Sequence, residues 1–341
     1  MRRLLPLAAA FACSACAVTP PPAPINSLPA VTVTARAETA PVGTAMADAA
    51  DDPAIWRNPA DPAASLIVAT DKKAGLHVYG LGGASRFFEP DGRLNNVDLV
   101  DMGQRGVIVV ASDRNDPRRA RLRLYRLDTA AAKLLPLGVV VGGRGEAYGV
   151  CLWANAGALH AFSVLKDGTI EEYRLHLDGA PRAEPVLTRK LATQSEGCVV
   201  DPRDGTLYVG EETAGIWRFA AGAKQGALVA AADGKQLVAD VEGLAILPQG
   251  ESGGWLVASS QGDNAYAVYN LPDMKPVGRF RIAAGKYGAT EETDGIALMG
   301  GGFGPDYPEG LFVAQDGANE PAAQNFKLAS WADVLKALNI P

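Results

Sequence analysis

Short runs of alternating apolar and polar residues recur along the chain, each led by a polar or acidic residue that is usually followed by glycine. The six copies are Asp52-Pro-Ala-Ile-Trp, Asn96-Val-Asp-Leu-Val, Tyr148-Gly-Val-Cys-Leu, Glu196-Gly-Cys-Val-Val, Glu242-Gly-Leu-Ala-Ile and Asp294-Gly-Ile-Ala-Leu. Their first residues are 44, 52, 48, 46 and 52 positions apart. A period of this size, with one strand-like run in each copy, is typical of a repeat architecture.

Each copy continues with two further strand-like segments joined by a short turn. These pairs begin at Leu66 and Leu76, Val107 and Leu122, Leu159 and Ile170, Leu207 and Ile216, Leu256 and Tyr266, and Leu311 and Asn325. Alternation over a few positions predicts half-buried strands. Helical periodicity is nearly absent before residues 331–338, which could form one or two turns. The sequence therefore predicts an all-β fold, a six-bladed β-propeller with a short C-terminal helical turn, because each blade can bury its faces against two neighbours.

The first thirty residues differ in composition from the repeats. Arg2-Arg3 followed by the apolar residues 4–12 predicts a signal peptide over residues 1–16. Ser14-Ala15-Cys16 is similar to a bacterial lipobox, which would make Cys16 an acylated N-terminus, but ordinary cleavage fits the same residues. We expect residues 17–30 to be a proline-rich tether and residues 31–341 to be the propeller domain. The expected protein is exported, as an outer-membrane lipoprotein or in periplasmic or secreted form.

Composition limits the partners that this chain could have. A net charge of −6 without an apparent basic face argues against nucleic acid. After the leader, no apolar run reaches the roughly 18–20 residues that a membrane span needs. We expect a monomer. The three histidines His77, His160 and His176 do not cluster in the sequence, which makes zinc an improbable ligand.

Carboxylates gather at the predicted strand ends, where the blades of a propeller meet the mouth of its channel. They are Asp51, Asp52, Asp98, Glu196, Glu211, Glu212, Asp240, Glu242, Glu291, Glu292 and Asp294. Any one of them could be a solvated loop residue, but five acidic positions in register favour a common site. Like charges within about 4–6 Å raise each other's pKa, so bound cations would be needed to keep them ionised. Oxygen ligands in flexible loops favour Ca²⁺.

Cationic residues stand at equivalent places in the first three repeats. Lys72 and Lys73 follow the second strand of repeat one, Arg114 that of repeat two and Lys166 that of repeat three. A single lysine in a turn is commonly just solvated. Cations at matched positions, opposite an acidic side of the same ring, instead predict a polyanionic ligand that Ca²⁺ bridges to the carboxylates.

Two cysteines remain beyond the leader, Cys151 and Cys198, in the first strands of adjacent repeats. An oxidising compartment would permit a disulfide between them. Their offset relative to the repeat suggests that one faces inward where the other faces away. Two separate buried thiols are therefore the favoured prediction, and a disulfide stays open as the alternative.

Several longer strings resemble the β-propeller phytases, the alkaline, calcium-dependent 3-phytases. The strings are Asp51-Asp-Pro-Ala-Ile-Trp56, Asp71-Lys-Lys73, Asn95-Asn-Val-Asp98, Glu196-Gly197, Glu211-Glu212, Asp240-Val-Glu-Gly-Leu244, Ala258-Ser-Ser-Gln-Gly262, Tyr266-Ala-Val-Tyr269, Thr293-Asp-Gly-Ile296, Phe312-Val-Ala-Gln-Asp-Gly317 and Asn325-Phe-Lys327. They occur in the expected order from about Ala37 to Trp331.

The resemblance implies hydrolysis of phytate, myo-inositol hexakisphosphate, or of calcium-phytate, by direct attack of a calcium-bound water. It also implies roles for individual residues. Active-site Ca²⁺ ions would be held by Glu38, Asp51, Glu196, Glu212, Asp240, Glu242 and Asp294. Structural Ca²⁺ ions would be held by Asp52, Asn96, Val97 and Asp316. Substrate phosphates would be bound by Lys72, Lys73, Arg114, Tyr148 and Lys166, all but Lys73 also acting in catalysis. One extra residue lies between Glu38 and Asp51 compared with the family pattern.

Two other functions fit a six-bladed propeller. A Ca²⁺-dependent lactonase would also keep a metal at the channel mouth, but it would need an apolar lid rather than a group of cations. A surface-anchored propeller that only binds ligands would suit the tether, but it has no reason to gather so many acids. The sequence favours the phytase over both.

Overall fold

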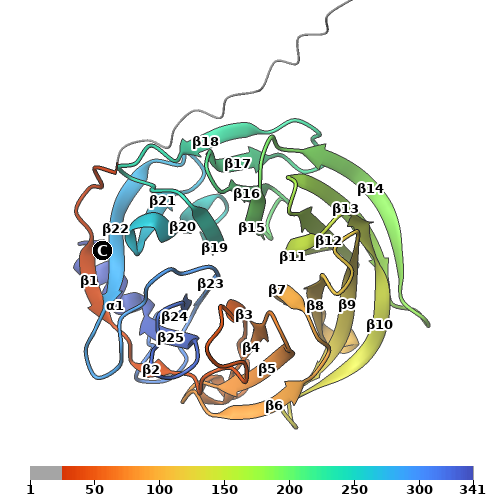
Figure 1. Ribbon diagram of the computed structural model, residues 1–341, viewed down its shortest axis with the longest axis horizontal. Coiled ribbons are helices and arrows are strands. Elements are labelled where there is room, and N and C mark those ends of the chain that lie inside the picture. Colours follow the sequence, from red (N-terminus) through yellow and green to blue (C-terminus); the bar gives the residue numbers. More distant parts are fainter. Residues whose placement is uncertain (1–24, 341) are drawn as a thin grey trace, which may run out of the picture.

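The computed structural model describes residues 25–340 as six β-sheets arranged around a central channel (Figure 1). The predicted six-bladed β-propeller is confirmed. The predicted helical turn is also present, as α1 (Trp331–Ala337). Short 3-10 turns occur at Pro62–Ala64, Gly103–Arg105 and Gln261–Asp263.

Each blade begins with its innermost strand and runs outward. Blade one has β3 (Ala50–Trp56), β4 (Leu66–Asp71), β5 (Gly75–Gly80) and β6 (Ser85–Glu89); blade two has β7 (Leu94–Asp101), β8 (Val107–Asp113), β9 (Arg119–Asp128) and β10 (Lys133–Arg144); blade three has β11 (Ala147–Asn155), β12 (Ala158–Leu165), β13 (Thr169–His176) and β14 (Arg182–Lys190). Blade four has β15 (Ser195–Val200), β16 (Leu207–Glu211), β17 (Gly215–Phe219) and β18 (Ala227–Ala231); blade five has β19 (Val241–Gln249), β20 (Gly253–Ser260), β21 (Ala265–Asn270) and β22 (Pro276–Ala283); blade six has β23 (Ile296–Gly300), β24 (Gly310–Asp316) and β25 (Asn325–Ser330).

The N-terminal segment completes the last two sheets. Strand β2 (Ala37–Glu38) pairs with β25 as the outer strand of blade six, and β1 (Val31–Thr34) runs parallel to β22 at the edge of blade five. The two ends of the repeat region are therefore joined by hydrogen bonds between strands from opposite ends of the chain. Closing a ring in this way leaves no interrupted blade.

The core lies between the blades, because each sheet buries both faces against its neighbours. Between blades five and six, Tyr266, Phe280 and Phe312 form an aromatic cluster with ring centroids 5.0–5.2 Å apart. Trp331 at the start of α1 adds its ring to this cluster, 6.3 Å from Phe280. The recurring apolar segments of the sequence therefore report burial between blades, not burial in one central core.

The structure contradicts the prediction of two separate thiols, because Cys151 on β11 and Cys198 on β15 form a disulfide. The prediction assumed that residues at equal positions of two neighbouring repeats face each other. Neighbouring blades turn opposite faces of equivalent strands toward their shared interface. An offset between the two cysteines is thus what brings both side chains to the interface of blades three and four, where they adjoin one apolar cluster.

The predicted signal peptide and Cys16 lie outside the described residues, as does most of the predicted tether. The last residues of the tether segment contact the propeller: the backbone N–H groups of Asn26 and Leu28 donate to the carbonyls of Gly234 and Lys235. Within residues 25–340 there is no helix with the length and apolar character of a membrane span.

Candidate active site and calcium cluster

At one mouth of the channel, every blade contributes two strand ends. The innermost strand begins there, and the second strand, being antiparallel to it, ends there. Neighbouring blades approach very closely at this mouth. A Cβ atom on Gly197 would lie 2.1 Å from the carbonyl oxygen of Glu242, and one on Gly149 would lie 2.0 Å from that of Glu196. The glycine in the repeated motif is therefore required by close backbone contact, and this contact draws the polar residues before it together.

Three buried glutamates form the centre of the acidic side. Glu196 on β15, Glu212 just after β16 and Glu242 on β19 each place a carboxylate oxygen within 4.8 Å of the other two. Oε1 of Glu212 and Oε2 of Glu242 have no hydrogen-bond partner among residues 25–340. We call these residues the glutamate cluster.

The electrostatics of the glutamate cluster are unfavourable without a cation. Burial raises the pKa of Glu196 well above its ordinary value, and the charges of Asp51 and Asp294 raise it further. Burial and the charge of Glu196 likewise raise the pKa of Glu242. Carboxylate oxygens without a hydrogen-bond partner among residues 25–340, gathered at one point, fit a hard divalent ion such as Ca²⁺, which takes 6–8 oxygen ligands. The donor set therefore suits Ca²⁺, although it also suits protons at low pH.

Beside the glutamate cluster, Lys72 is surrounded by carboxylates. Its Nζ lies 2.7 Å from Asp48, 2.9 Å from Asp51 and 2.7 Å from Asp294. Burial alone would lower the pKa of Lys72, but these three charges raise it above its ordinary value. Burial and Asp51 raise the pKa of Asp294 to about 7 despite the contact with Lys72. The second carboxylate oxygen of Asp51, Oδ1, has no partner within the described part of the chain.

The remaining predicted cations gather around Tyr148. The Arg114 guanidinium lies 6.0 Å and Lys166 Nζ 5.1 Å from the centre of its ring. Within residues 25–340 the one ion pair of Arg114 is a long contact, 3.7 Å, with Glu146. Burial and the charges of Glu196, Glu242 and Glu212 raise the pKa of Tyr148, so its hydroxyl stays protonated beside the glutamate cluster. The structure thus places two cations and one hydroxyl donor next to the acids.

Side chains that the sequence did not single out hold several of these groups in place. Asn95 Nδ2 donates to Glu196 Oε1 at 2.5 Å, and Gln261 Nε2 donates to Asp294 Oδ1 at 2.7 Å. Asp48 pairs with Lys72 from the loop before β3. Asn95 and Gln261 lie in strings that resemble the phytases, which was an available signal. Asp48 lies in an exposed loop with no recognisable pattern.

Other predicted ligands lie in different surroundings. Asp52 Oδ2 accepts the backbone N–H of Val97 at 3.1 Å, so Asp52 and the Asn96-Val97 segment are together. Glu38 and Asp316 both contact Lys327 Nζ, at 2.7 and 3.0 Å, and within residues 25–340 neither makes a hydrogen bond or ion pair with a member of the glutamate cluster.

Asp240 and Lys73 complete the predicted set. Asp240 precedes β19 and is close enough for its charge to raise the pKa of Glu212. Lys73 is exposed next to the buried Lys72 and makes no ion pair within residues 25–340.

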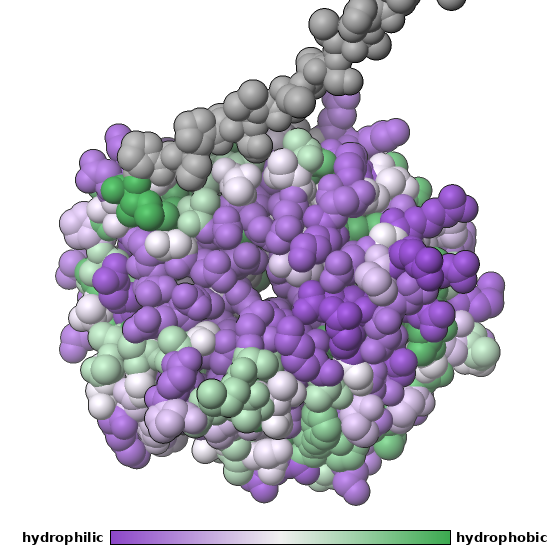
Figure 2. All heavy atoms as spheres, viewed as in Figure 1, coloured by the Kyte–Doolittle hydropathy of each residue, from purple (hydrophilic) through white to green (hydrophobic). Residues whose placement is uncertain are grey.

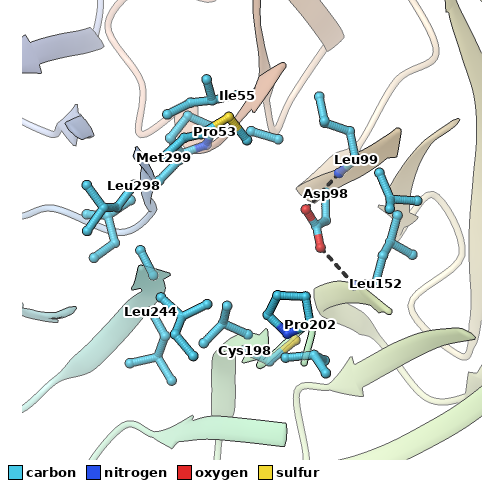
Figure 3. Close-up of a pocket in the computed structure, with 18 of the residues that line it drawn as sticks. Pro53, Ile55, Asp98, Leu99, Leu152, Cys198, Pro202, Leu244, Leu298 and Met299 are labelled. Carbon is cyan, nitrogen blue, oxygen red and sulfur yellow. Dashed lines mark hydrogen bonds between the residues drawn. The ribbon is translucent and has the colours of Figure 1, made fainter. Parts of the chain in front are cut away.

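Further along the channel the lining becomes apolar. A cavity of about 370 Å³ is lined by side chains that include Ile55, Leu152, Leu244 and Met299 (Figure 3). Its one labelled carboxylate, Asp98, accepts hydrogen bonds from the N–H groups of Leu99 and Leu152, both at 2.7 Å. Burial nonetheless raises the pKa of Asp98 to about 7. On the face shown in Figure 2, hydrophilic residues surround the central opening.

Comparisons with known proteins show the family of this chain. The family model described as Phytase matches residues 2–340. The chain belongs to the phytase family. It is similar to the 3-phytase of Bacillus subtilis (strain 168), with 39% identity over 328 residues, 90% of this chain and 85% of that protein. A crystal structure of BBS1N in complex with ARL6DN has a TM-score of 0.48 and 11% identity, over 77% of this chain and 74% of that one.

Family membership confirms the resemblance found in the sequence and the prediction of a phytase-type hydrolase. The roles of individual residues in this phytase stay predictions. So do the ion sites at Asp52, Asn96, Val97 and Asp316, and the catalytic ion at Glu38.

Proposed function

We propose that this phytase releases phosphate from phytate in a Ca²⁺-dependent reaction at the channel mouth. The observation that carries the proposal is the glutamate cluster, whose unpaired buried oxygens lie beside Tyr148, Arg114 and Lys166. A site that joins uncompensated acids to available cations suits a ligand that is itself highly anionic and is bridged by metal ions. Phytate, with six phosphate groups on one ring, has this chemistry.

The calcium ligands would be Glu196, Glu212 and Glu242, with Asp51, Asp240 and Asp294 at the same mouth. When bound there, Ca²⁺ supplies charge neutralisation and lowers the pKa of water. The other functions belong to the chain's own residues. Arg114 and Lys166 stabilise negative charge on the phosphoryl oxygens, and the protonated Tyr148 hydroxyl donates a hydrogen bond to one of them.

Lys72 has a different part in this proposal. Because its Nζ contacts Asp48, Asp51 and Asp294, it holds these carboxylates together before any ligand is present. A phosphate that reaches this group would meet a lysine already fixed in position. Preorganised positive charge of this kind favours the transition state, since no reorganisation is needed at the moment of reaction.

The direct test is release of inorganic phosphate from phytate by the purified protein, with Ca²⁺ and after treatment with EDTA. We expect activity with Ca²⁺, its loss in EDTA and its return when Ca²⁺ is added in excess. A Lys166→Ala variant should have roughly 10- to 1000-fold lower activity if the lost contact costs about 1.4–4 kcal/mol. Exposed Lys224→Ala serves as the matched control. Full activity in excess EDTA would exclude the calcium-dependent reaction.

The proposal includes export to the periplasm or the cell exterior, with or without a lipid on Cys16. Support comes from the Cys151–Cys198 disulfide, because disulfides persist in oxidising compartments. Fractionation of cells that express the full chain tests this point. Recovery of the protein only from the cytoplasm, with reduced cysteines, would contradict it.

A further inference from the structure

The outer edge of blade two carries an open groove that the proposed reaction does not use. It lies where β9 begins and β10 ends and has a volume of about 700 Å³. Four arginines line it, Arg118, Arg119, Arg121 and Arg144. Val139 and Val141 supply apolar surface between them and are 42% and 53% exposed. We call this the arginine groove.

Strand register places these side chains on one face of the sheet. Arg119 is paired with Arg144 across the two strands, and Arg121 is paired with Val141. Arg119 and Arg121 are two residues apart on β9, so both point to the same side. A bulge between Val141 and Gly143 brings Arg144 into register with them. The sheet thereby gathers like charges that would repel one another without an anion.

The arginines have little to neutralise them. Three of the arginines make no ion pair or side-chain hydrogen bond with any residue of 25–340: Arg119, Arg121 and Arg144. The fourth, Arg118, makes one long ion pair, in which its Nε lies 3.9 Å from Asp116 Oδ1. Blade two, residues 94–144, has nine arginines and lysines against five aspartates, a net charge of +4 in a chain of −6. The overall acidity of the chain thus conceals a local basic surface.

We propose that the arginine groove is a second, non-catalytic binding site for a small polyphosphorylated anion. Planar guanidinium groups match phosphate oxygens in pairs, so several around one groove favour a ligand with several phosphates. The groove volume falls in the range of small-molecule sites, about 300–1,000 Å³. The choice of inositol polyphosphates as the ligand class rests on the proposed function, whereas the existence of an anion site does not.

Two other anionic partners fit the groove less well. Single-stranded nucleic acid is held by aromatic side chains on which bases stack, and the lining residues include no aromatic one. Surfaces that insert at a lipid interface commonly carry Trp or Tyr, whereas the apolar lining here is three valines and one alanine within a concavity. We therefore commit to a free, soluble ligand.

Residues of the arginine groove are close in sequence, and linked by hydrogen bonds, to residues of the channel mouth. Arg118 is four residues after Arg114, and its carbonyl accepts the N–H of Gly145 at 3.1 Å. The next residue, Glu146, is the one that contacts Arg114. A ligand held in the groove would thus be beside the proposed phosphate-binding cations, in a position to raise the local concentration of substrate or to retain product.

The test uses myo-inositol hexakissulfate, which resembles phytate in charge and carries no phosphate to release. Its binding to the full protein is measured by isothermal titration calorimetry in EDTA, where the uncompensated acids of the mouth repel anions. We expect one molecule bound, more weakly as NaCl is raised. The triple variant Arg119→Gln, Arg121→Gln, Arg144→Gln should bind at least roughly tenfold more weakly. The matched control, Arg126→Gln, Arg174→Gln, Arg182→Gln, should bind as the wild type does.

Each result decides the proposal. Equal binding by the triple variant and the control would overturn it, as would absence of binding by the wild type. Binding of the wild type to phosphatidylglycerol vesicles but not to the hexakissulfate would also overturn it, in favour of a lipid surface. Because the measurement is made without Ca²⁺ and without turnover, loss of the proposed phytate hydrolysis would not affect it.

Discussion

Two acidic clusters of this phytase differ in how their charge is balanced. At the closure of the ring, Glu38 and Asp316 meet the fully buried Lys327, whose Nζ also contacts Asn319 and Asn325 oxygens at 3.1 and 2.9 Å. In the glutamate cluster no lysine or arginine of residues 25–340 forms an ion pair with the carboxylates, and two carboxylate oxygens have no hydrogen-bond partner there. Where the protein provides its own cation the cluster can be a structural joint, and where it does not a ligand ion is needed.

The largest effect should follow from breaking the closure cluster. Lys327→Met removes the cation and leaves Asp316 buried and unpaired, which should cost about 3–5 kcal/mol of unfolding free energy. The lower value is expected because Glu38 is 34% exposed. Urea denaturation in EDTA measures this, with exposed Lys336→Met as the control. Stabilisation of Lys327→Met by Ca²⁺ well beyond that of the wild type would show instead that Asp316 can hold an ion.

Adjacent glutamates provide a sharper comparison at the mouth. Glu211 accepts three hydrogen bonds, from Thr193 N and Oγ1, both at 2.7 Å, and from Trp217 Nε1 at 2.8 Å, whereas Glu212 keeps an unpaired oxygen. Glu212→Gln should lower phytate turnover roughly 100-fold, a cost of about 2.7 kcal/mol, and raise the Ca²⁺ concentration for half-maximal activity.

Glu211→Gln is the matched comparison, since it should mainly lower the melting temperature. A weakened hydrogen-bond set of this kind costs about 1–3 kcal/mol. Calcium titrations of activity, together with thermal unfolding of both variants, separate the two effects. If Glu211→Gln shifts the calcium dependence and Glu212→Gln only the melting temperature, the roles assigned to the two residues are reversed.

Lys72 combines features of both clusters. It forms ion pairs with carboxylates, as Lys327 does, and these carboxylates adjoin the glutamate cluster. Lys72→Ala should lower turnover roughly tenfold or more and should also lower the melting temperature in EDTA, since Asp51 and Asp294 lose their cation. Calcium should restore much of the stability but little of the turnover. A variant equally stable with and without Ca²⁺ would mean that Lys72 is not the balancing charge.

The smallest expected effect concerns pH. The pKa values of Asp294 and Asp98 are about 7 in the folded protein, against about 4 in an unfolded chain. A carboxyl group with a raised folded pKa contributes stability that is complete below its unfolded pKa and is lost as pH rises through the folded pKa.

In EDTA the melting temperature should therefore fall by a few degrees between pH 5 and pH 8, and excess Ca²⁺ should reduce that fall. Differential scanning fluorimetry across this range measures it. Asp98 lies in the apolar part of the channel, and the Asp98→Asn variant should lose only the part of the pH dependence of the melting temperature that Asp98 contributes. A melting temperature in EDTA that rises toward pH 8 would contradict the assignment.

Much of the fold could be predicted because burial between blades leaves a repeated record in the sequence. The three inner strands of each blade carry recurring apolar segments, several of them buried along their whole length, and all were found. The outer strands were not, since residues such as those of β6 and β14 are mostly exposed and need no alternation. The closing strand β2 has only two residues, which is too short for any pattern.

The candidate site was only partly accessible from the sequence. The motif positions identified Glu196, Glu242 and Asp294, because the glycine that follows each one reports the close approach of blades. The partners of these acids could not be inferred, since Lys72 meets Asp294 across 222 positions of sequence. The disulfide was missed for a related reason, as the facing of neighbouring blades is a property of the ring and not of the repeat.

The sequence by itself determined the period, the inner strands, the phytase family and the supply of acids and cations at strand ends. Only the tertiary structure decided which acids are balanced by lysine and which are left for an ion. It also decided that four arginines of an acidic chain share one groove. The physical reason is that the apolar pattern of a strand depends on its local burial, whereas charge balance depends on distances that are set when the ring closes.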